Sequence, residues 1–97
     1  LISGPVEMAE GTVVGPGAKL VGPAALGSGC RIDERAVVDG SVLWDKVWVK
    51  SGAVVRDSVL ASNCVVDEGS LVEGRVLGQG EEVKKALSAT PKGKKRR

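Results

Sequence analysis

The sequence has no histidine, and this absence excludes several kinds of active site. Histidine is the commonest general base and a frequent metal ligand, so we expect no Ser-His or Cys-His nucleophile pair and no His-ligated metal. The two cysteines, Cys30 and Cys64, form no Cys-x-x-Cys pattern, which argues against a zinc site. From the residues alone we therefore expect no catalytic, cofactor-binding or metal-binding residue in this chain.

Large rings and long apolar runs are also scarce. The 97 residues contain no Phe and no Tyr, and the only aromatic residues are Trp44 and Trp48. We therefore expect a core of aliphatic side chains. No apolar run approaches the roughly 18 residues of a membrane span, and the first residues show no signal-peptide pattern. We expect a cytoplasmic protein with no membrane partner, and the start at Leu1 suggests a piece of a longer chain or a processed product.

Charge is unevenly distributed along the chain. The formal net charge is +2, but residues 1–83 hold 7 basic and 12 acidic side chains, whereas residues 84–97 hold 7 basic and no acidic ones. A basic tail can bind nucleic acid or an anionic membrane. No aromatic residue interleaves with these charges and no RNA-binding motif is present, so we favour a solvated tail and expect no nucleic-acid partner.

A six-residue repeat dominates the sequence. One aliphatic or Met residue recurs at steps of six, shortened to five before Leu43, Leu60 and Leu77, so that three steps make 18 residues early in the chain and 17 later. We call these residues anchors. They are Ile2, Met8, Val14, Leu20, Leu26, Ile32, Val38, Leu43, Val49, Val55, Leu60, Val66, Val72, Leu77 and Val83.

Each repeat unit reads as a short strand followed by a corner. The residue two before an anchor is small or β-branched in most units, and residues two apart in a strand face the same side. Each strand thus sends one large and one small side chain inward, and Gly or Pro often follows the anchor, where turns need them. Because a six-residue period does not fit the 3.6 residues per turn of an α-helix, we predict an all-β, single-stranded parallel β-helix of about five triangular coils over residues 1–83.

The repeat ends at Val83, and residues 84–97 form a second region. Residues 80–89 have the composition of a helix, and a short helix there could cap the open end of the last coil. The remainder, with its four terminal basic residues 94–97, reads as a flexible basic tail.

Several candidate motifs have simpler structural explanations. Cys30 and Cys64 share the inward small position two coils apart, about 9.6 Å at 4.8 Å per coil, which is too far for a disulfide. The Gly-x-Gly pairs at 15–17, 27–29 and 78–80 complete no nucleotide-binding fingerprint, so we interpret them as corners. Charged residues should form columns of alternating sign on the surface, one of Asp33, Lys50 and Asp67 and one of Asp39, Arg56 and Glu73.

The outward strand positions give the candidate functional site. Strand propensity alone accounts for valine at such positions. We favour an interface, because contiguous exposed apolar columns rarely stay uncovered and Trp is enriched at interface centres. The predicted interface residues are Val37, Val42, Trp44, Trp48, Val54, Val59, Val65, Leu71 and Val76.

The repeat over residues 2–83 resembles the hexapeptide-repeat family of left-handed parallel β-helices. The left hand is implied only by this resemblance, because general crossover rules favour the right hand. Acyltransferases and carbonic-anhydrase-type members of the family depend on histidine, so both activities are excluded for a chain without it.

A closer resemblance is to the C-terminal β-helix of sugar-nucleotide pyrophosphorylases, including mannose-1-phosphate guanylyltransferases and glucose-1-phosphate nucleotidylyltransferases. It rests on SVLWDKVWVKSGAVVRDSVLASNCVVDEG at 41–69 and on residues 1–30. It implies a role in assembly or regulation, with the chain's own catalytic domain and a homo-oligomer as partners. The parent enzyme would use Mg²⁺, a nucleoside triphosphate and a sugar 1-phosphate, and none of its catalytic residues maps onto this chain.

Two alternatives stay open at this point. Related β-helix domains serve as non-enzymatic scaffolds or oligomerisation modules in larger complexes. The chain could also form a trimer by itself, with apolar faces meeting around a threefold axis. A glycine-rich nucleotide loop in an upstream doubly wound domain would favour the enzyme.

Overall fold

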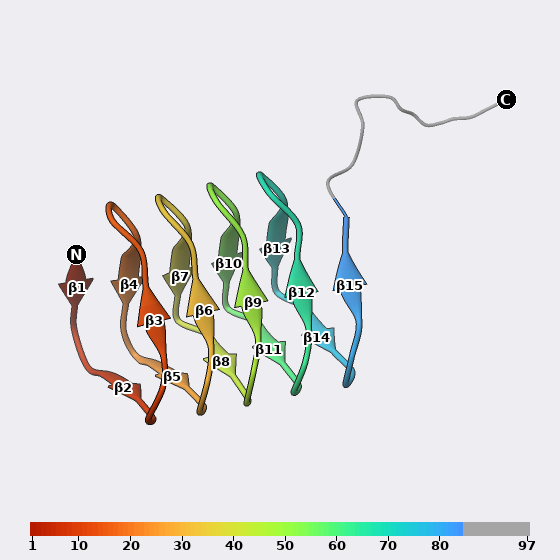
Figure 1. Cartoon of the computed structure of the whole chain (residues 1–97), viewed down its shortest axis with the longest axis horizontal. Helices are drawn as coiled ribbons and strands as arrows, with labels where there is room; N and C mark the ends of the chain where they lie inside the picture. Colours follow the sequence, from red (N-terminus) through yellow and green to blue (C-terminus); the bar gives the residue numbers. More distant parts are fainter. Residues whose placement is uncertain (85–97) are drawn as a thin grey trace, which may run out of the picture.

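A computed structural model of the protein describes residues 1–84, which wind into a triangular prism of five coils (Figure 1). Each coil contributes one strand to each of three parallel five-stranded sheets, which form the three faces. The β1 face contains β1 (Ile2–Ser3), β4 (Lys19–Val21), β7 (Val37–Asp39), β10 (Val54–Arg56) and β13 (Leu71–Glu73). The β2 face contains β2 (Val6–Met8), β5 (Ala24–Leu26), β8 (Val42–Leu43), β11 (Val59–Leu60) and β14 (Val76–Leu77). The β3 face contains β3 (Val13–Val14), β6 (Arg31–Ile32), β9 (Trp48–Val49), β12 (Val65–Val66) and β15 (Glu82–Val83).

The strand register follows the six-residue repeat. Leu60 pairs with Leu43 on one side and with Leu77 on the other, so residues 17 apart lie one rung apart. In the early coils the step is 18, as in the pairing of Leu20 with Val38. This register confirms the predicted parallel β-helix of about five coils.

The coil is left-handed, as the family resemblance implied. In Figure 1 the chain rises along the front through β3, β6, β9 and β12, and descends behind through β4, β7, β10 and β13. It advances from left to right as it turns in this sense, which defines a left-handed path.

The interior is filled by the anchors and the small residues two positions before them. Leu20, Leu43 and Leu60 are fully buried, and the small residues Ala36 and Ala53 pack beside them. Burying one aliphatic side chain of this size stabilises a fold by about 1.5–3 kcal/mol, so the stacked anchors are the main source of stability. The first coil lies at an open end, and there Ile2 and Met8 remain 54% and 43% exposed.

The corners depend on left-handed backbone conformations, and four of them use residues other than glycine. Gly17 and Gly52 have φ of 73° and 70°, and Arg35 stands between them in the same corner column with φ of 59°. Lys46, Asp57 and Asn63 are the other three, with φ of 57°, 49° and 67°. Asn and Asp adopt this conformation with less strain than most side chains, whereas Arg35 and Lys46 are held there by the rungs on either side.

The C-terminal region was predicted to contain a short helix over residues 80–89. Its first residues belong instead to the last coil, where Gly80 lies in a turn and Glu82 and Val83 form β15. Residues 85–97, with the rest of that predicted helix and the basic tail, lie outside the described residues. Across residues 1–84 the structure has no helix with the length and apolar character needed to cross a membrane.

Candidate functional site

The three faces have a common interior but differ in their outward side chains. Each strand presents one outward residue just before its anchor and another just after it, which gives two outward columns per face. On the β3 face six of these positions are charged: Arg31, Asp33, Lys50, Asp67, Glu82 and Lys84. The β1 face has four: Lys19, Asp39, Arg56 and Glu73.

The β2 face is nearly free of charge. Its outward residues before the anchors are Glu7, Ala25, Val42, Val59 and Val76, and those after them are Ala9, Gly27, Trp44, Ala61 and Gly78. Glu7 is the only charged residue in these two columns. The sequence prediction used the column before the anchors together with Trp44. The second column, with four small residues and one Trp, was the missed signal that distinguishes this face from the others.

The apolar side chains of the β2 face are open to solvent. Val42 and Val59 are 40% and 39% exposed, and Trp44 and Val76 are 58% and 79% exposed. Val59 and Val76 share their rungs with Ala61 and Gly78, and Val42 shares its rung with Trp44, so among residues 1–84 no charged or long polar side chain of these rungs covers them. Four of the nine predicted interface residues therefore lie together on one bare surface.

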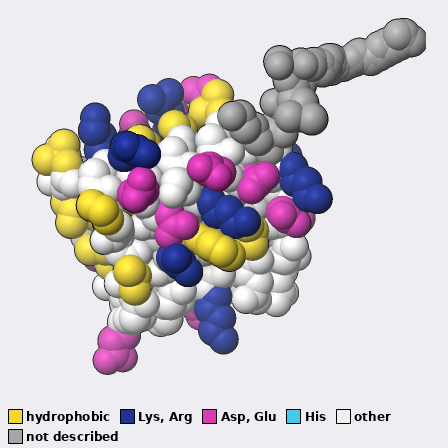
Figure 2. Space-filling model, turned by 45° about the horizontal axis from the view of Figure 1, so that its top comes forward, with side chains coloured by type: hydrophobic (Ala, Val, Ile, Leu, Met, Phe, Trp, Pro, Cys, Tyr) yellow, Lys and Arg dark blue, Asp and Glu magenta, His cyan; other side chains and the backbone are white. Residues whose placement is uncertain are grey.

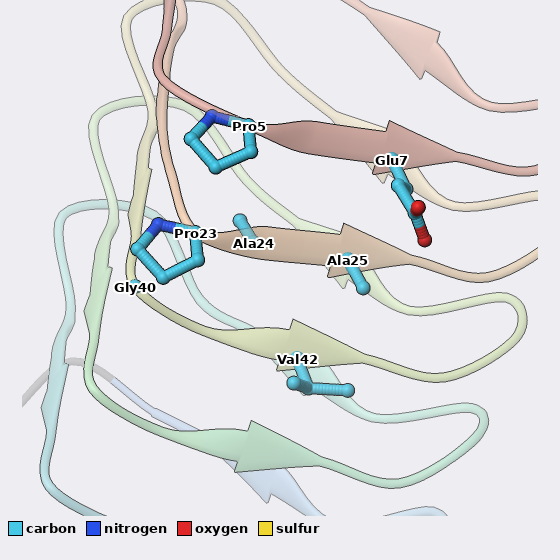
Figure 3. Close-up of a pocket in the computed structure, with 7 residues that line it drawn as sticks. All are labelled: Pro5, Glu7, Pro23, Ala24, Ala25, Gly40 and Val42. Atoms are coloured by element: carbon cyan, nitrogen blue, oxygen red, sulfur yellow. The ribbon is translucent and has the colours of Figure 1, made fainter.

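A hollow of about 470 Å³ opens at the N-terminal end of the same face (Figure 3). Glu7, Ala25 and Val42 lie one above another on the successive strands β2, β5 and β8, and the prolines Pro5 and Pro23 stack along one side of the hollow. The hollow exists because Ala25 is short between two longer side chains. The β2 face thus has a depression at its first coils and a ridge of valines at its last.

Trp48, another predicted interface residue, lies on the β3 face and is half-buried. Its indole Nε1 donates a hydrogen bond of 2.9 Å to Asp33 Oδ2. Arg31 and Lys50 lie over its ring, 5.0 Å and 4.6 Å from the centroid. Arg31 also bonds Asp33 at 2.9 Å, and Lys50 approaches Asp67 at 3.8 Å. These ionic and cation–π contacts already satisfy the ring, and its neighbour Val65 is half-buried.

Figure 2 shows side chains of both signs interspersed over much of the visible surface. The apolar side chains visible in that view gather toward the end near the N-terminus. Leu1, Ile2 and Val13 are among the exposed apolar residues of that end.

The β1 face is intermediate between the other two. Val37 and Val54 are half-buried, and Leu71 is 57% exposed. A charged column runs beside them, in which Arg56 lies 4.0 Å from Asp39. This is one of the two columns of alternating charge predicted from the sequence, and the Lys50–Asp67 pair belongs to the other. Exposed pairs of this kind contribute about 0–1 kcal/mol each.

The two cysteines are free and buried, as predicted. Cys30 Sγ donates to the carbonyl of Trp44 at 2.9 Å, and Cys64 Sγ donates to that of Gly78 at 3.1 Å. Burial raises the pKa of both thiols above the ordinary value of 9.0. A thiol held protonated in this way is a poor nucleophile and a poor metal ligand.

Within the part of the chain that the structure describes, no three His, Cys, Asp or Glu side chains gather where they could hold a metal ion. The interior is packed with aliphatic side chains. Among the described residues, the feature that stands out is the exposed apolar surface of the β2 face.

Comparison with known proteins agrees with this geometry. The model of the GMPPB C-terminal domain family matches residues 2–91, nearly the whole chain. The chain belongs to the GMPPB C-terminal domain family. This membership bears out the resemblance carried by residues 1–30 and 41–69.

A curated relative of the chain is the "Bifunctional protein GlmU" of Trichlorobacter lovleyi. It is 32% identical over 57 residues, which is 59% of this chain and 12% of that protein. The chain therefore spans only a small part of this relative. No solved structure matches the chain.

Proposed function

We propose that this chain is the non-catalytic C-terminal assembly domain of a sugar-1-phosphate nucleotidyltransferase. The observation that supports the proposal is the match to the GMPPB C-terminal domain over residues 2–91. The enzyme's own catalytic domain would transfer a nucleotidyl group from a nucleoside triphosphate to a sugar 1-phosphate, release pyrophosphate and use Mg²⁺. We propose the cytoplasm as its location.

The physical basis for an assembly role is the uneven surface of the prism. Apolar columns such as Val42, Val59 and Val76 on one face are energetically unfavourable in water and become favourable when another protein surface covers them. Exposed Trp44 adds a large ring of the kind that dominates interface energies. The β-helix itself is rigid, because each rung is held by backbone hydrogen bonds to the next, as in Val59 N to Arg75 O at 2.9 Å.

The test is an assay of the full protein that contains this domain. With Mg²⁺ and a panel of nucleoside triphosphates and sugar 1-phosphates, we expect pyrophosphate release with one pair of substrates. The separate chain of residues 1–97 should show none. Deleting residues 1–97 from the full protein should reduce the size of its assembly in solution.

Two results would contradict the proposal. If the full protein releases pyrophosphate with no pair in the panel, the non-enzymatic scaffold becomes the better interpretation of the fold. If deletion of residues 1–97 leaves the assembly unchanged in size, the domain has no assembly role.

A further inference from the structure

We propose that the β2 face binds the β2 face of a second copy of this chain, with the two prisms running in opposite directions. A twofold axis would lie parallel to the strands at the third coil, so that coil 3 meets coil 3, coil 2 meets coil 4 and coil 1 meets coil 5. This proposal rests on the assembly role proposed above and specifies the partner and the geometry of contact. Three features of the face support it.

The first feature is shape. The hollow lies over Ala25 in coil 2, and Val59 projects from the matching position in coil 4, one coil to the other side of Val42. The twofold axis brings each Val59 over the partner's Ala25. Because of the symmetry, the valine of each copy enters the hollow of the other. Val42 and Trp44 of coil 3 lie near the axis and meet their own copies, which places the largest exposed ring at the centre of the interface.

The second feature is charge. Glu7 in coil 1 is the one charge in the outward columns of this face, and Arg75, two residues before the anchor Leu77, directly precedes β14 in coil 5. Both side chains are exposed. The opposed arrangement brings each Glu7 near the partner's Arg75. Prisms running in the same direction would instead place Glu7 against Glu7 and leave two hollows facing each other.

The third feature is size. Five rungs at 4.8 Å and about six residues along each side of a coil give a face of about 24 by 20 Å, or roughly 1,000 Å² buried in total by two copies. Interfaces of this size are at the low end for specific complexes and associate weakly. We therefore expect a concentration-dependent dimer, which covalent trapping detects better than sizing alone.

Disulfide trapping tests the geometry directly. We expect Val42→Cys to cross-link with itself under mild oxidation. A mixture of the Ala25→Cys and Val59→Cys chains should give a heterodimer in at least several-fold excess over the homodimer of either. The native chain is the background control because Cys30 and Cys64 are buried, and Val65→Cys is the matched control on the β3 face.

Each other outcome would overturn the proposal. Efficient homodimers of Ala25→Cys would show prisms running in the same direction. Equal cross-linking of Val65→Cys and Val42→Cys would show unspecific collision, and no cross-link from the mixture would show that the β2 faces do not meet this way. None of these results affects the pyrophosphate assay, so the geometry can fail while the proposed function stands.

A charge reversal provides an independent check. Glu7→Arg and Arg75→Glu should each weaken dimerisation about threefold to tenfold, and the double variant should restore most of it. Circular dichroism of each variant would establish that it is folded. A double variant no better than the single variants would show that the two side chains do not pair.

Discussion

The β2 and β3 faces share one interior but have opposite surfaces. Beneath both lie buried anchors such as Leu60 and Val66, each fully shielded from water. Outside, the β3 face places Arg31 and Lys50 over the ring of Trp48, whereas Trp44 on the β2 face has no such cover. An apolar residue in an outward column is thus available for binding only when the neighbouring column leaves it bare.

The largest expected effect tests the shared interior. Leu60→Lys and Val66→Lys should both unfold the chain, because a buried unpaired charge costs several kcal/mol. Val59→Lys, one residue before Leu60, should leave the fold intact because its side chain faces outward. Circular dichroism melting of the three variants checks the register. A folded Leu60→Lys variant would show that the inward side has been assigned wrongly.

A smaller effect should separate the two tryptophans. Trp48→Ala removes a half-buried ring, its hydrogen bond to Asp33 and its contacts with two cations, and we expect a loss of about 1–3 kcal/mol in the free energy of unfolding. Trp44→Ala should lower the stability of the monomer by less than about 1 kcal/mol. Urea denaturation of dilute protein measures both values. If the two variants lost the same free energy of unfolding, Trp48 would not be more tightly packed than Trp44, which would contradict the difference between the β3 and β2 faces.

Two buried serines differ in whether their hydroxyl group has a hydrogen-bond partner. Ser58 Oγ, below the β2 face, donates to Arg56 O at 2.7 Å and accepts from Arg75 N at 3.1 Å. Ser70 Oγ, below the β1 face, is buried without a hydrogen-bond partner in the structure. We expect Ser58→Ala to destabilise the fold by about 1–2 kcal/mol and Ser70→Ala to stabilise it by up to about 1 kcal/mol. Thermal or urea denaturation should give opposite signs, and a loss for both would contradict the assignment.

A further prediction is a pH dependence that arises below the β3 face. Cys30 and Cys64 have raised pKa values in the folded chain, so the unfolded chain loses their protons first as pH rises. Stability from these groups is therefore fully present below pH 9.0 and falls above it, by up to about 1.4 kcal/mol per pH unit for each thiol. Urea denaturation between pH 7 and 10.5 measures the slope. The Cys30→Ala, Cys64→Ala double variant should show a shallower fall.

Most of the fold could be predicted from the sequence because the same six-residue pattern occurs many times along the chain. Each of the fifteen anchors, such as Leu43, must be an aliphatic or Met residue that points inward, and a sequence would rarely meet this condition fifteen times by chance. The fixed spacing also predicts that Leu43, Leu60 and Leu77 lie on successive rungs, as they do. The corners were less predictable. Arg35 and Lys46 adopt positive φ because the rungs on either side impose it, and no property of their side chains indicates this.

The surface could be predicted only in part. Periodicity shows that Trp48 and Val59 face outward, and the structure agrees. Whether an outward residue is covered depends on side chains from adjacent rungs, such as Arg31 lying over Trp48, which the sequence pattern did not include. The hollow over Ala25 is lined by Pro5 and Pro23 from two successive coils, so the sequence pattern of one coil does not indicate it. Reading both outward columns of each face would have singled out the β2 face.

We propose that the β2 face, and not the β3 face, is the surface through which the chain assembles. Val59→Lys and Val65→Lys place the same change on β11 and β12 of the same coil, one on each face. Sedimentation equilibrium at high protein concentration should show self-association of the native chain and of Val65→Lys, with Val59→Lys remaining monomeric. Equal behaviour of the two variants, or a native chain that stays monomeric at the highest concentration, would contradict the claim.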